Sequence, residues 1–119
     1  MQESIDGLRK SPAAHALCYL DLDQFKLIND TCGHAAGDEL LRQLSVMLQK
    51  RVRRSDTLAR LGGDEFAILM ENCTIEKAQE VADGIRRATE DFQFLWDRKK
   101  FSVGVSIGVV PVNLSLIHI

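Results

Sequence analysis

The sequence is poor in the residues that mark several classes of protein. Its three cysteines are an odd number and form no C-x-x-C pair, which argues against a disulfide scaffold and a zinc ribbon. No apolar run approaches the roughly 20 residues of a membrane span, and the polar N-terminus is unlike a signal peptide. A net charge of −2 gives no reason to expect nucleic acid or an anionic membrane as a partner. We therefore expect a cytoplasmic domain, free or as the cytoplasmic part of a longer, membrane-attached or multidomain protein.

What is present is typical of one globular domain. The 119 residues are 45% hydrophobic and 27% charged, which are ordinary values for a folded chain. A chain of this length can bury roughly two thirds of its unfolded surface. We interpret residues 1–14, with turn signals at Asp6-Gly7 and Ser11-Pro12, as an approach segment before the first periodic element.

The spacing of apolar residues predicts alternating strands and helices in the order β-α-α-β-β-α-β-β. Because a hairpin stands in the middle, the sheet is expected to be mixed or mainly antiparallel and the class α+β. The expected elements are a strand over 16–20, a helix over 24–30, a loop over 31–37, a long helix with Asp38 and Glu39 in its first turn, strands over 58–61 and 66–70, a helix after Thr74, and strands over 92–96 and 101–110.

Carboxylates occur at two positions where chemistry is expected. Asp21 directly follows the first buried strand, where a poorly hydrated carboxylate needs a partner or a cation. Asp64 and Glu65 follow a Gly-Gly turn, whose glycines leave room for a nucleotide near the backbone. If this hairpin pairs beside the first strand, Asp21 and Asp64 converge, and such oxygen ligands favour Mg²⁺ and phosphoryl or nucleotidyl transfer. Spacing alone leaves an ordinary turn at each position as an equal alternative.

Longer strings resemble the GGDEF family of diguanylate cyclases. The similarity runs from about Ala16 to Val112, and we interpret residues 15–112 as a partial GGDEF domain. The strings that carry it are Asp21-Leu22-Asp23-Gln24-Phe25-Lys26-Leu27-Ile28-Asn29-Asp30, Gly33-His34, Gly37-Asp38, Arg60-Leu61-Gly62-Gly63-Asp64-Glu65-Phe66 and Ser106-Ile107-Gly108-Val109.

The resemblance implies a bacterial signalling enzyme that condenses two GTP molecules into cyclic di-GMP and two pyrophosphates. The implied cofactor is Mg²⁺ or Mn²⁺, and the implied assembly is a homodimer with one GTP in each subunit. The implied fold is the ferredoxin-like palm of nucleotide cyclases and polymerases, without contacts to nucleic acid or membrane.

The resemblance also implies roles in metal binding and catalysis. Asp21, the backbone carbonyl of Leu22 and Asp64 would bind the metal. Asp64 would also accept the proton of the 3′-hydroxyl, and its neighbour Glu65 would be needed for catalysis. Lys26 matches a lysine that stabilises transition-state charge, a role suited to a compact cation. Without the resemblance, Lys26 would be read as an ordinary solvated surface residue.

Substrate contacts are implied at the following helices and at the glycine turn. Asn29 and Asp38 match the pair that reads the guanine edge, since carboxylate and amide oxygens accept from its N–H groups. His34 lies at a substrate-contact position, while the backbone near Phe25 and near Gly62-Gly63 would meet the phosphates. Without the resemblance, a helix end at Asn29 and an ordinary loop residue at His34 remain open alternatives.

Arg53 and Asp56 form an R-x-x-D pattern shortly before the glycine turn. The pattern resembles the family's inhibitory site, where the product cyclic di-GMP binds. Arginine suits bidentate contacts with phosphate and with the guanine edge. The alternative is simply a basic helix end.

The chain departs from the family pattern after Val112, where the family continues into a helix that grips the GTP phosphates. Residues 113–119 show no counterpart, and we interpret them as a tail for which non-native sequence is one explanation. We therefore expect little or no cyclic di-GMP synthesis from this chain. The competing interpretation is a non-catalytic module that binds GTP or cyclic di-GMP and regulates a fused phosphodiesterase domain. A related palm-fold cyclase or nuclease fits the carboxylates but not the guanine-reading pair.

Overall fold

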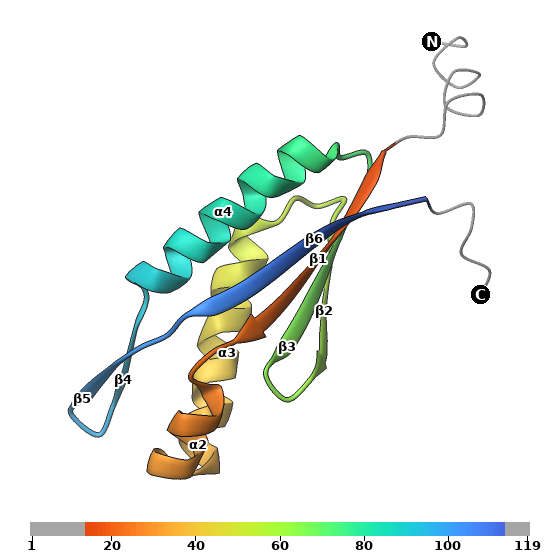
Figure 1. Cartoon of the computed structure of the whole chain (residues 1–119). Coiled ribbons are helices and arrows are strands. Elements are labelled where there is room, and N and C mark those ends of the chain that lie inside the picture. The colour runs from red at the N-terminus through yellow and green to blue at the C-terminus, as the bar shows by residue number, and fades with distance from the viewer. Residues whose placement is uncertain (1–13, 114–119) are drawn as a thin grey trace, which may run out of the picture.

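The computed structural model describes residues 14–113 (Figure 1). The predicted α+β class is confirmed, whereas most of the predicted approach segment and tail, residues 1–13 and 114–119, lies outside the described residues. The elements are β1 (His15–Leu22), α2 (Phe25–Cys32), α3 (His34–Arg51), β2 (Thr57–Gly62), β3 (Glu65–Met70), α4 (Ile75–Asp91), β4 (Gln93–Trp96), β5 (Lys99–Ser102) and β6 (Val105–Val112).

The main sheet is antiparallel and has the strand order β2-β3-β1-β6. The β2–β3 hairpin therefore pairs directly beside β1, which is the condition under which the sequence predicts that Asp21 and Asp64 come together. Asp21, near the end of β1, lies opposite Glu65 of β3 on one side and opposite Ser106 of β6 on the other. Because residues directly opposite in an antiparallel pair share a face, these three side chains emerge together at one end of the sheet.

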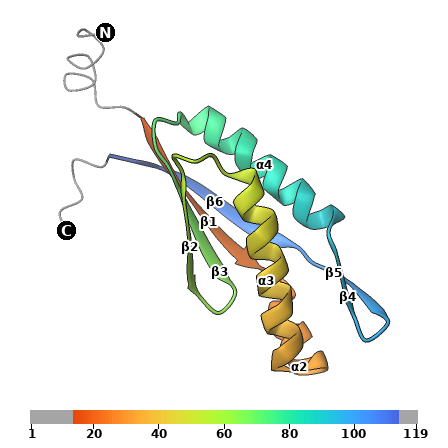
Figure 2. The ribbon, with the colours of Figure 1, turned by 180° about the vertical axis from the view of Figure 1, so that it is seen from behind.

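One face of the sheet is buried and the other is open. Side chains alternate along the strands, so that Cys18, Leu20 and Ile68 face the core that α3 and α4 complete. Figures 1 and 2 show the two long helices on the same side of the sheet. On the other face Tyr19 remains 41% exposed and Val110 51% exposed. The carboxylates of Asp21 and Glu65 belong to this open face, which a ligand can approach.

The predicted loop over residues 31–37 was wrong. Helix α2 continues to Cys32 and α3 begins at His34, so that Gly33 alone separates them. Gly33 has a φ of 95°, a conformation that L-residues rarely adopt, and its N–H donates to the Asn29 carbonyl at 2.9 Å. As a consequence, Asp38 lies beyond the first turn of α3 and does not stabilise the helix N-terminus in the way the sequence predicts.

The predicted continuous strand over 101–110 was also wrong. Its first part is β5, which pairs with β4 in a separate two-stranded sheet, and its second part is β6, which pairs with β1. The chain changes sheets at Val103 and Gly104. Within residues 14–113, none of the helices is both long and apolar enough to cross a membrane.

Candidate metal and nucleotide site

Three carboxylates meet at the end of the sheet where the β2–β3 turn lies beside β1. Asp21, Asp64 and Glu65 each offer an oxygen atom, and these oxygens all lie within 4.8 Å of one another. The Leu22 N–H donates to the Asp64 carbonyl at 3.0 Å, which ties the turn to the end of β1. The structure thus brings together side chains that are 43 positions apart in the chain, as Asp21 and Asp64 are numbered.

The negative charges of this cluster oppose one another. Partial burial raises the pKa of Asp21, and the charges of Asp64 and Glu65 raise it further. All three residues are half-buried, so solvent screens the repulsion only in part. A set of hard carboxylate oxygens that repel one another fits a divalent cation such as Mg²⁺, whose charge would offset theirs.

Tyr19 lies beside this cluster and was missed from the sequence. Its hydroxyl donates a hydrogen bond to Glu65, and this bond, followed by desolvation, raises the pKa of the phenol. Strand alternation was the signal that could have found it, because a residue two positions before Asp21 in a strand must lie on the same face of the sheet. Tyr19 stands opposite Ala67, which has only a methyl group, and Gly108, which has no side chain, so its ring stays uncovered.

The residues predicted to contact phosphate adjoin the cluster. Asp23 and Gln24 form the turn between β1 and α2, and Phe25 begins α2 with its ring packed against the core. Lys26 is exposed on the same helix. A side chain at Gly62 or at Gly63 would meet nothing within 4 Å, so the glycine turn borders open space.

The predicted guanine-reading residues lie at the corner between α2 and α3. The Oδ1 atom of Asn29 is buried and, among the described residues, accepts no hydrogen bond. Gly37 of α3 lies against it, because a Cβ at Gly37 would stand 2.8 Å from the Asn29 Cγ. Asp38 follows Gly37 directly and is exposed, as is His34 at the start of α3. No role for Gly37 followed from the sequence.

Arg53 and Asp56 lie at the opposite end of β2 from the glycine turn. The Asp56 carboxylate accepts from the Arg53 backbone N–H at 2.9 Å and from its Nη2 at 3.0 Å. The same Nη2 donates to the Glu71 carbonyl at 2.9 Å. The Asp56 side chain is 2% exposed, whereas that of Arg53 is 50% exposed. Asp56 therefore organises the loop, and Arg53 faces solvent from a fixed position.

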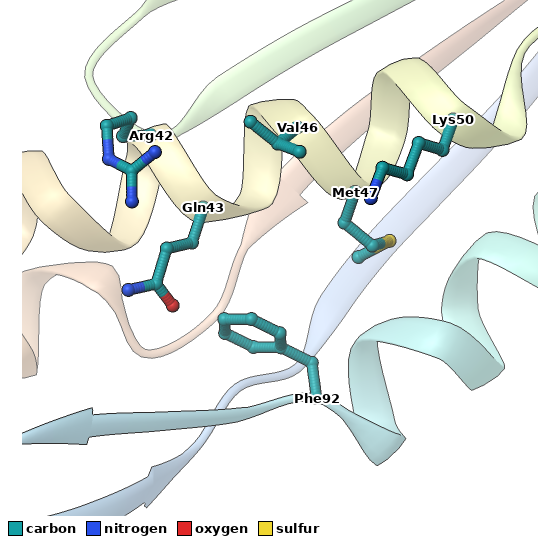
Figure 3. Close-up of a pocket in the computed structure, with 6 residues that line it drawn as sticks. All are labelled: Arg42, Gln43, Val46, Met47, Lys50 and Phe92. Carbon is teal, nitrogen blue, oxygen red and sulfur yellow. The ribbon is translucent and has the colours of Figure 1, made fainter.

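A cavity of about 340 Å³ lies between α3 and the start of β4 (Figure 3). It contains none of the predicted site residues, and the carboxylate cluster lies outside it. Its lining consists of Arg42, Gln43, Val46, Met47, Lys50 and Phe92.

Comparisons with known proteins show which families and folds this chain resembles. Residues 1–115 match the family model described as diguanylate cyclase, GGDEF domain. The chain is 46% identical over 99 residues to "Probable diguanylate cyclase DgcE" of Escherichia coli (strain K12), covering 83% of this chain and 9% of that protein. It is 40% identical over 111 residues to "Cyclic di-GMP phosphodiesterase PdeB" of Shewanella oneidensis, covering 91% of this chain and 13% of that protein.

Among solved structures, a sensory box/GGDEF family protein from Caulobacter crescentus CB15 matches with a TM-score of 0.79 and 33% identity. The match covers 92% of this chain and 70% of that one. By contrast, the chain spans only a small part of the full length of DgcE and PdeB, 9% and 13% respectively.

Proposed function

The chain belongs to the GGDEF family, the diguanylate cyclase domains, and from this premise we propose that it binds Mg²⁺-GTP as the catalytic domain of a diguanylate cyclase. The observation that carries the proposal is the meeting of Asp21, Asp64 and Glu65 at an open sheet end. In the proposed reaction, each 3′-hydroxyl oxygen bonds to the α-phosphorus of the other GTP in a homodimer. The bond from that phosphorus to pyrophosphate breaks, and the hydroxyl proton passes to a carboxylate.

The donor set suits a metal and a triphosphate. Asp21, Asp64 and the Leu22 carbonyl would hold Mg²⁺ or Mn²⁺, which when bound supplies positive charge to phosphate oxygens and acidifies the hydroxyl. Asp64 would receive the proton, and Glu65 would keep the site anionic. Lys26, exposed in the first turn of α2, would stabilise charge that develops on the leaving phosphate.

The selection of guanine follows from unmatched hydrogen-bonding groups. Within residues 14–113, the buried Asn29 Oδ1 accepts no hydrogen bond, which is unfavourable until a donor arrives. Guanine offers N–H groups on its pairing edge, and the Asp38 carboxylate, exposed on the adjoining helix, can accept from a second one. His34 would border the base. Adenine lacks the matching pair of donors, so the site should discriminate against ATP.

Isothermal titration calorimetry tests the proposal without requiring turnover. We expect the chain to bind GTP only when Mg²⁺ is present, and to bind ATP at least about tenfold more weakly. If GTP binds equally well with excess chelator, or if ATP binds as tightly as GTP, the proposed function is wrong.

A second activity, the binding of cyclic di-GMP at Arg53 and Asp56, is favoured by the fixed and half-exposed Arg53 guanidinium. This binding would suit product inhibition, or regulation of a fused domain. We also propose a cytoplasmic setting for this domain, which spans 9% of DgcE and 13% of PdeB.

Replacing Arg53 with alanine should weaken cyclic di-GMP binding at least about tenfold, because a charge-assisted phosphate contact is lost. Arg54→Ala is the matched control, an exposed arginine one position along in the same loop. Fluorescence anisotropy with labelled cyclic di-GMP measures both variants. Equal losses in the two would indicate general attraction to basic charge and contradict a specific site.

A further inference from the structure

The turn after β1 is tied to the start of β6 by a set of hydrogen bonds that we call the β1–β6 clamp, formed by Asp23, Gln24, Gly104 and Ser106. We propose that the clamp positions the backbone of residues 22–25 for metal and phosphate, and that Asp23 acts as a positioning residue and not as a metal ligand. The inference rests on the proposed function, and it assigns roles to residues outside the carboxylate cluster.

Three hydrogen bonds make up the clamp. The Asp23 N–H donates to the Gly104 carbonyl at 3.0 Å. The Gly104 N–H donates back to the Gln24 Oε1 at 3.0 Å, and the Ser106 hydroxyl donates to the Asp23 Oδ1 at 2.9 Å. Both side chains of the turn thus accept from β6 or the residue before it, across about 80 positions of sequence.

Residues 22–24 are also bonded to the β2–β3 hairpin, on the side away from β6. The Leu22 N–H donates to the Asp64 carbonyl at 3.0 Å, so residues 22–24 are bonded to the glycine hairpin on one side and to β6 on the other. The groups in this segment that the proposed function needs are backbone groups, namely the Leu22 carbonyl and the amides near Phe25. A backbone group has no rotamer of its own, so its direction depends on how the turn is held.

The position of Asp23 separates it from the carboxylate cluster. Among the described residues, the cluster that could share an ion consists of Asp21, Asp64 and Glu65, and Asp23 is not a member. One of its oxygens accepts from Ser106, and the other lies 2.9 Å from where a Cβ at Gly104 would stand. Both oxygens therefore face β6, and the D-x-D spacing produces one metal-facing carboxylate and one that faces the neighbouring strand.

Gly104 permits this close approach. A methyl group there would also lie 3.5 Å from the Gln24 Oε1, whereas a methyl group at Gly108, within β6, would meet nothing within 4 Å. The two glycines thus provide a matched pair, in which the same added methyl group disturbs the clamp at one position only.

Calorimetry with Mg²⁺-GTP on this chain tests the clamp. We expect Asp23→Ala, Ser106→Ala and Gly104→Ala each to weaken Mg²⁺-GTP binding about five- to tenfold. The double variant Asp23→Ala/Ser106→Ala should bind Mg²⁺-GTP within about twofold of the weaker-binding single variant, because each single substitution already removes the same Ser106–Asp23 hydrogen bond. Ser106→Thr keeps the hydroxyl and should restore binding, and Gly108→Ala should leave it unchanged.

The possible outcomes separate the clamp from the function on which it rests. A wild-type chain without Mg²⁺-dependent GTP binding would overturn the proposed function and the clamp's role together. Intact wild-type binding with no loss in Ser106→Ala would overturn the clamp alone. A loss in Asp23→Ala far exceeding that in Ser106→Ala, with additive effects in the double variant, would show that Asp23 acts directly on the ligand. If circular dichroism shows that Asp23→Ala does not fold, the role of the clamp is tested by Ser106→Ala and Ser106→Thr alone. Weaker Mg²⁺-GTP binding in Ser106→Ala but not in Ser106→Thr would support the clamp, and equal binding in the two would overturn it.

Discussion

Asp64→Asn is expected to weaken Mg²⁺-dependent GTP binding at least about a hundredfold while leaving the domain as stable as before. The substitution keeps the size of the side chain but removes one charge from the cluster with Asp21 and Glu65. The proposed Mg²⁺ binding would depend on those charges, whereas the fold does not. In the hydrogen bond from Leu22 it is the backbone carbonyl of residue 64 that accepts, and this group is retained in the variant.

The pH dependence of stability supplies a second measurement for this variant. Burial, followed by the Asp64 and Glu65 charges, raises the pKa of Asp21 above its ordinary value of 3.8. A carboxyl whose pKa is raised by folding contributes stability at low pH that is lost as the pH rises through the folded-state pKa. Removing the Asp64 charge reduces that loss. Without metal, Asp64→Asn should therefore unfold at the same temperature as the wild type or a higher one near neutral pH.

Asp91→Asn is the control for loss of an exposed carboxylate, since Asp91 lies at the end of α4, far along the chain from the cluster. Calorimetry should show wild-type GTP affinity for this control. Mg²⁺-GTP binding by Asp64→Asn within a few-fold of the wild type would rule out Asp64 as a metal ligand. A large fall in thermal stability would instead indicate a structural role for its carboxylate.

Gly37→Ala is expected to destabilise the domain by about 1–3 kcal/mol and to weaken GTP binding at least about tenfold. Alanine normally favours a helix over glycine, so helix propensity alone predicts the opposite sign for stability. Here the added methyl group would overlap the Asn29 carboxamide, with Cγ at 2.8 Å, and would stand 3.3 Å from the Phe25 ring. Asn29 must then move, and the acceptor proposed for guanine moves with it.

Gly84→Ala in α4 provides the comparison. A methyl group at Gly84 would meet only the Arg51 Nη1 atom at 4.0 Å, an ordinary contact, and the residue lies well inside the helix. This variant should gain up to about 1 kcal/mol of stability and keep its GTP affinity. Urea unfolding and calorimetry measure both quantities. If the two variants change stability in the same direction, contact with Asn29 does not determine the role of Gly37.

The order of the strands and helices could be read from local patterns. An apolar run that stops at Asp21, a Gly-Gly turn before Asp64 and helical spacing after Thr74 are each decided within a few residues, so the α+β class followed from them. Two predicted element boundaries were wrong, because in each case the conformation of a single residue, set by the surrounding fold, determines where the element ends. Gly33 makes a corner without a loop, and Gly104 is where the chain passes from one sheet to the other.

The candidate site divides in the same way. The sequence by itself determined which carboxylates, amide and lysine are available, because motif and spacing are local properties. Only the tertiary structure decided that the Tyr19 hydroxyl meets Glu65, that the Asn29 carboxamide packs against Gly37, and that Asp23 accepts a hydrogen bond from Ser106. The pairing of β1 with β6 sets the last of these contacts, and an antiparallel register between strands more than 80 residues apart leaves no local trace in the chain.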